Sequence, residues 1–90
     1  MIIAGVLIET VPGGAARVGA LLSRRPDLEL HGGDGHSRLA GVWCAETGEA
    51  LERAAEALLE HDPDILGVFP TLIGDDSEHG RPSWTQRFER

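Results

Sequence analysis

Two stretches of the chain are apolar at nearly every position. Residues 2–8 and 39–45 consist of apolar or small side chains, many of them β-branched or aromatic. Runs of this length are too short to cross a membrane, and this composition favours strands over helices. Residues 28–31 alternate apolar and polar side chains, and residues 65–69 form another short apolar run. The pattern therefore predicts four strands.

The segments between these runs carry the periodicity of amphipathic helices. The first is predicted to open near Pro12 and to reach about Arg25 before Pro26 stops it. In the second, Thr47 is expected to cap the helix, with Glu49 in its first turn. The apolar stripe consists of Ala15, Val18, Leu21 and Leu22 in the first helix, and of Leu51, Ala54, Ala55, Leu58 and Leu59 in the second.

The two halves of the chain repeat one pattern. Placing Glu9–Thr10 on Glu46–Thr47 also places Pro26–Asp27 on Pro63–Asp64. Each half is a strand–helix–strand unit, and glycine-rich residues 32–35 predict the hairpin that joins them. The order βαββαβ predicts a ferredoxin-like α+β fold, a four-stranded antiparallel sheet with two helices on one face. The strand that opens each unit should lie at the centre of the sheet.

This fold leaves one face of the sheet without a helix, although both predicted central strands are apolar on both faces. A monomer rarely exposes a large apolar patch to water. A second copy of the chain, the chain's own tail or a partner protein would each cover the face. We expect a folded domain over residues 1–73, with residues 74–90 as a polar and mobile tail, Pro70 marking an edge strand.

Composition narrows the possible partners and the compartment. The chain has 90 residues, enough for one small domain, and a formal charge of −7. An acidic surface argues against nucleic acid and suits a basic partner. Cys44 is the only cysteine, and no basic segment precedes a long apolar run at the N-terminus. We therefore expect no internal disulfide, no secretory signal and a cytoplasmic location.

Enzymatic and metal chemistry find little support. The four histidines and Cys44 show no pair at metal-ligand spacing, so no metal site is expected. Cys44 lies in an apolar strand, where a thiol is unreactive. The glycine-rich residues 32–35 open a strand, so they lack the helix N-terminus of a phosphate loop. No acid, base and nucleophile occur at a spacing typical of a catalytic site. We therefore expect no catalytic residues and no cofactor.

Several of these features together resemble the NapD family of small cytoplasmic chaperones. They are the prolines around the first helix, Leu28–His31, the hairpin from Gly35 to Leu39, the Ala45–Thr47 junction and the closing Ile65–Val68 strand. The resemblance spans residues 2–73. It implies a protein that binds the twin-arginine signal peptide of the periplasmic nitrate reductase catalytic subunit and delays export until the molybdenum cofactor is loaded. It also implies a monomer or weak homodimer.

The candidate peptide-binding residues follow from the alternation of the strands and from charge. Trp43 is either a core residue or a binding anchor, and the sequence leaves this open. Acidic residues after the last strand would attract a basic peptide. The alternative function is a dimeric ferredoxin-like module that senses a small molecule. The predicted binding set is Glu29, His31, Trp43, Phe69, Thr71, Asp75 and Asp76.

Overall fold

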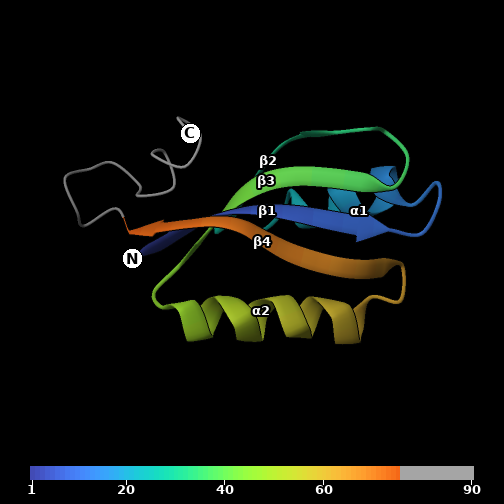
Figure 1. Ribbon diagram of the computed structural model, residues 1–90. Helices are drawn as coiled ribbons and strands as arrows, with labels where there is room; N and C mark the ends of the chain where they lie inside the picture. Colours follow the sequence, from blue (N-terminus) through green and yellow to red (C-terminus); the bar gives the residue numbers. More distant parts are fainter. Residues whose placement is uncertain (76–90) are drawn as a thin grey trace.

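A computed structural model of the protein describes residues 1–75 and shows a sheet with two helices (Figure 1). The predicted order βαββαβ is confirmed. The elements are β1 (Ile2–Thr10), α1 (Ala15–Leu22), β2 (Leu28–Gly33), β3 (Arg38–Ala45), α2 (Gly48–His61) and β4 (Ile65–Asp75).

The four strands form one antiparallel sheet in the order β2-β3-β1-β4. The strands that open the two units, β1 and β3, are central, as the repeat predicts. They pair along their whole length, from Ile2 opposite Ala45 to Glu9 opposite Arg38. The result is the ferredoxin-like α+β architecture expected from the sequence.

The core lies between the sheet and the two helices. Alternate residues of β1, including Ala4, Val6 and Ile8, are buried, and they belong to the same cluster as residues from both helices. Both helices therefore cover the same face of the sheet. The buried cluster consists of Ala4, Val6, Ile8, Val18, Leu22, Leu28, Trp43, Leu51, Ala55 and Ile65.

The helix α1 is shorter than the predicted segment at both ends. It begins at Ala15 because Gly13 has a φ of 80°, a backbone conformation that an α-helix does not contain. At the other end the N–H groups of Arg24 and Arg25 bond to carbonyls only three residues back, at Leu21 and Leu22. This tighter turn ends the helix, so the expectation that Arg25 lies in its last turn is wrong.

The helix α2 follows the prediction closely. Thr47 is its N-cap, and the Thr47 hydroxyl accepts a hydrogen bond of 3.0 Å from the N–H of Ala50. Glu49 lies in the first turn, where its charge favours the helix dipole. At the far end, Arg17 of α1 bonds to Asp62 (2.6 Å) and to Asp64 (3.0 Å). These ion pairs tie α1 to the end of α2.

The edge strand β4 runs further than its apolar residues indicate. It continues through Pro70 to Asp75, beyond the predicted domain end at residue 73. Proline is accepted there because β4 pairs only with β1, and its other side needs no N–H donor. The register shifts next to Pro70, which leaves Thr71 without a pairing residue on β1.

The predicted hairpin between β2 and β3 is held by an aspartate. One oxygen of Asp34 accepts hydrogen bonds from the N–H groups of His36, Ser37 and Arg38, each at 2.9–3.0 Å. These donors lower the pKa of Asp34 to about 2. Gly35 has a φ of 74°, which explains the glycine at this turn.

Candidate functional site

The face of the sheet opposite the core carries an apolar strip across three strands. Ile3 and Leu7 lie on this face because their neighbours in β1 point into the core. Leu7 pairs with Ala40 on one side and with Phe69 on the other. Within the described residues no helix packs on this face. We define the apolar strip as Ile3, Leu7, Ala40, Val42, Cys44 and Phe69.

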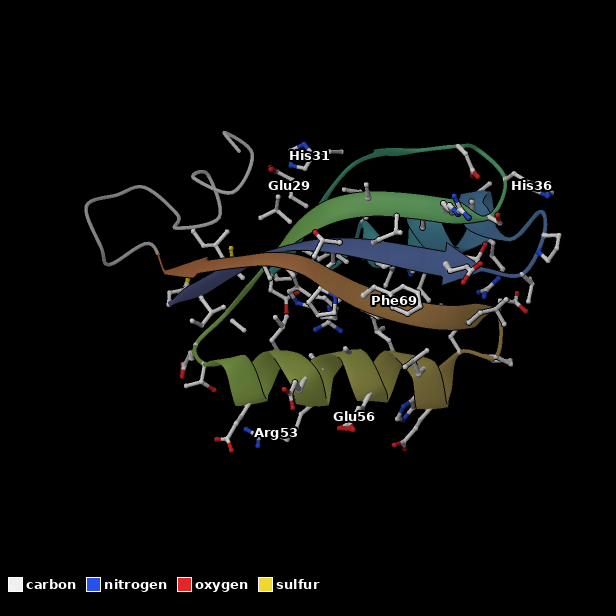
Figure 2. The ribbon with its side chains drawn as sticks, viewed as in Figure 1. Glu29, His31, His36, Arg53, Glu56 and Phe69 are labelled. Atoms are coloured by element: carbon white, nitrogen blue, oxygen red, sulfur yellow. The ribbon has the colours of Figure 1, made fainter. Side chains whose placement is uncertain are left out.

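Phe69 is the most prominent member of the apolar strip. Its side chain lies over the front of the sheet, turned away from the core (Figure 2), and the residue is 50% exposed. Its ring rests on Gly67, since a methyl group on Gly67 would lie 2.5 Å from the Phe69 Cζ. The missing side chain at Gly67 therefore lets the aromatic ring lie close against the strand.

Charged side chains border the apolar strip. At the β2 edge, the Glu29 carboxylate lies 3.0 Å from the His31 Nε2, and both residues are exposed (Figure 2). At the end of the central pair, Glu9 stands opposite Arg38. Leu28 is buried in the core and Leu30 packs against it, so the alternation expected for β2 is present. The apolar strip thus has carboxylates both at its side and at one end.

Trp43 lies in the core and not on the open face. It pairs with Ala4 on the covered side of the sheet and is 0% exposed. Its indole Nε1–H donates to the Asp27 carboxylate at 3.0 Å, and the Arg25 guanidinium lies 5.3 Å from its ring centroid. Full burial leaves no surface of Trp43 for a partner to contact. Trp43 is therefore corrected from binding residue to core residue, the other role that the sequence allowed.

The partners of Trp43 also change the ionisation of Asp27. The bidentate hydrogen bonds from Arg25 to Asp27, at 3.0 and 2.9 Å, lower the pKa of the Asp27 carboxyl. The bond from the indole lowers it further, against the opposing effect of burial. Arg25, Asp27 and Trp43 thus form one connected polar group at the margin of the core.

The remaining predicted residues divide by position. Thr71 is exposed, and its hydroxyl donates to the Gly5 carbonyl at 3.1 Å, across the bulge in β4. Asp75 is the last residue of β4, paired with Ile2 at the end of the sheet. Asp76 lies outside the described residues, as do residues 77–90 of the predicted tail. The structure brings Phe69 and Thr71 together on β4, while Glu29 and His31 stand at the opposite edge.

The prediction from sequence omitted most of the apolar strip. Ile3, Leu7 and Val42 are not in the predicted binding set, although they form its centre. The sequence did indicate a second apolar face, because both alternating sets of residues in β1 are apolar. It did not show which parity the helices would cover, so the sequence left the role of Trp43 open and did not indicate Val42.

The described residues contain neither a metal site nor a membrane-spanning helix. Across residues 1–75, no three His, Cys, Asp or Glu side chains gather as a metal site would require. Neither α1 nor α2 has the length and apolar character needed to span a bilayer. Comparison with family models, with curated proteins and with solved structures found no match.

Proposed function

We propose that this protein is a cytoplasmic chaperone that binds the twin-arginine signal peptide of the periplasmic nitrate reductase catalytic subunit precursor. Binding would delay export until the cofactor has been inserted. The choice of client rests on the resemblance to NapD. The observation that carries the binding role is the apolar strip on a sheet face that α1 and α2 leave free.

The width of the apolar strip suits one helix. It crosses β3, β1 and β4, which are neighbours in the sheet. Adjacent strands are about 4.8 Å apart, so three of them span about 10 Å. A helix with its side chains is about 10–12 Å wide. A signal peptide whose apolar core forms a helix would cover Leu7, Val42 and Phe69 together and remove them from water.

The charges of the protein suit the basic part of such a peptide. The chain carries a formal charge of −7, and Glu29 and Glu9 border the apolar strip. Paired arginines next to the apolar core of the peptide would meet these carboxylates at the rim. Rim charges chiefly raise the association rate and fix orientation, so added salt should slow association.

A second copy of the chain is the competing occupant of the apolar strip. In a dimeric sensor of small molecules the same leucine, valine and phenylalanine side chains would pack against their equivalents. Sedimentation separates the two functions. The chaperone is a monomer or weak dimer that the peptide converts to a one-to-one complex, whereas the sensor stays dimeric when the peptide is added.

Calorimetric titration with a synthetic twin-arginine signal peptide tests the proposal. We expect micromolar affinity, a negative heat-capacity change from apolar burial, and weaker binding when salt is raised. A peptide with serines in its apolar core is the matched control, and it should bind at least about tenfold more weakly. The proposal fails if the peptide does not bind at about 100 µM, or if both peptides bind equally.

A further inference from the structure

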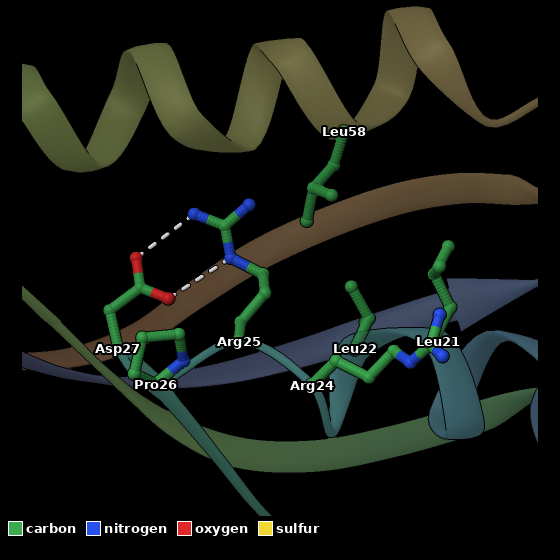
Figure 3. A pocket seen from close by; sticks show the side chains of 7 residues that line it. All are labelled: Leu21, Leu22, Arg24, Arg25, Pro26, Asp27 and Leu58. Carbon is green, nitrogen blue, oxygen red and sulfur yellow. Dashed lines mark hydrogen bonds and ion pairs between the residues drawn. The ribbon is translucent and has the colours of Figure 1, made fainter.

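A concave surface lies on the helix side of the molecule, away from the apolar strip. It is a groove of about 650 Å³ between the end of α1, the segment that follows it and α2 (Figure 3). Leu21 and Leu22 come from α1, and Leu58 comes from α2. A groove of this size is in the range that holds a small molecule. The proposed function does not use it.

Aliphatic side chains form most of the groove wall. Leu22 is buried in the core, Leu58 packs against the core, and Leu21 is 42% exposed. Leu21 is therefore an apolar side chain that the rest of the described protein does not cover. A ligand with an aliphatic or aromatic body would remove part of this surface from water, at roughly 25 cal/mol per Å².

Two arginines stand at the same groove. Arg25 directs its Nε and Nη2 groups to Asp27, which leaves the edge with Nη1 unused within the described residues. Arg24 is exposed and makes no side-chain hydrogen bond or ion pair with any described residue. Asp27 is the only carboxylate among the lining residues, so the groove is locally positive in a chain of charge −7.

We infer that this groove binds an apolar monocarboxylate, a small molecule with one carboxylate on an aliphatic or aromatic body. The leucine wall would hold the body. The carboxylate would reach Arg24, because a planar guanidinium edge matches the two oxygens of a carboxylate. One surplus positive charge suits a single negative charge. A phosphate dianion would bring more charge and more acceptors than this lining can satisfy.

Titration of the full chain with octanoate, followed by leucine methyl NMR, tests the inference. We expect a Kd of about 1 mM or tighter, with shifts at Leu21 and Leu58. Octanol has the same aliphatic body without the charge, and it should bind about tenfold more weakly. Leu7, in the apolar strip, should not shift with octanoate, which separates this site from the proposed peptide site.

A matched pair of variants tests the charge. Arg24→Gln should weaken octanoate binding about tenfold, whereas Arg53→Gln should leave it unchanged. Arg53 is an exposed arginine that points from α2 away from the sheet (Figure 2). Both substitutions remove one surface charge, so only a local contact distinguishes them.

Three results would overturn the inference. They are equal binding of octanoate and octanol, equal effects of the two arginine variants, and octanoate shifts at Leu7 in place of Leu21 and Leu58. Absence of octanoate binding would overturn it as well, and a dimer that Leu21→Ser dissociates would then assign the groove to a second copy of the chain.

Discussion

The two faces of the sheet are built from the same kinds of side chain, but only one of them is buried by the helices. On the covered face, Ala4, Ile8 and Trp43 are completely buried beneath the helices. On the other face, Leu7 and Val42 are only half-buried, and Phe69 is half exposed. The difference lies in which face receives the helices. Apolar character alone does not distinguish a core position from a position on the open face in this protein.

This contrast predicts that the two faces affect different properties, the covered face the free energy of unfolding and the open face the affinity for a partner. Side chains on the covered face should determine the free energy of unfolding, because their removal leaves a cavity. Side chains of the apolar strip are less buried, so they should have less effect on unfolding. Under the proposed function they should have more effect on affinity, because a bound peptide would cover their remaining surface. The following predictions test each half of this contrast.

The largest expected effect is on the covered face. Trp43→Ala should lower the free energy of unfolding by about 3–5 kcal/mol, because it removes the largest fully buried side chain. Its neighbour on the open face is the control, and Val42→Ala should cost about 1 kcal/mol. Urea denaturation measures both. Equal losses for the two variants would contradict the assignment of the faces.

The second-largest effect on the free energy of unfolding is expected at the polar partners of Trp43. Asp27→Ala leaves the buried indole N–H without its acceptor, and we expect a loss of about 1–3 kcal/mol at pH 7. Glu56→Ala, on the outer surface of α2, is the control and should change stability little (Figure 2).

The same carboxylate gives a pH dependence of known sign. The folded state lowers the pKa of Asp27, so its stabilising contribution is present above the unfolded pKa and is lost as pH falls through the folded pKa. Acid unfolding of Asp27→Ala should lack this part of the dependence. Identical pH profiles for the variant and the parent would refute the role given to Asp27.

On the open face, Phe69→Ser should lower the affinity for the signal peptide while leaving the free energy of unfolding nearly unchanged. We expect affinity for the signal peptide to fall about tenfold while the free energy of unfolding changes by less than about 1 kcal/mol. Leu59→Ser is matched to it, since Leu59 is 39% exposed on α2, outside the apolar strip. Calorimetry on both variants checks the prediction, and unchanged affinity for Phe69→Ser counts against the binding role.

A smaller change at the same place sharpens the test. Gly67→Ala would push the Phe69 ring off the strand without changing the composition of the apolar strip. We expect affinity to fall about threefold, with stability nearly unchanged, because the ring can move outward. If Gly67→Ala matches Phe69→Ser in affinity, the ring position matters as much as its presence.

The order of elements could be read from the sequence because local patterns specify it. The repeat around Glu9–Thr10 and Glu46–Thr47 predicted the topology, and Thr47 predicted the start of α2. The ends of α1 are harder to predict from the sequence, since they depend on the backbone conformation at Gly13 and on a tight turn after Leu22. The strand β4 passes Pro70 because only one of its sides is paired, which a local pattern does not reveal.

The candidate site was predicted less completely, for a physical reason. Both parities of β1 and β3 are apolar, so alternation divides each strand into two faces without showing which one the helices cover. Trp43 and Val42 are neighbours in the chain and lie on opposite faces. The groove beside Arg24 and Leu58 joins segments far apart in the sequence, and only the tertiary structure shows it.

Mapping the bound signal peptide by amide chemical shifts tests the central claim most directly. On adding the twin-arginine peptide to isotope-labelled protein, we predict the largest shifts at Leu7, Val42 and Phe69. Residues of α2 that point away from the sheet, such as Arg53 and Glu56, should stay unchanged. Shifts confined to the helices, or none on the open face, would contradict the proposal that the apolar strip binds the peptide.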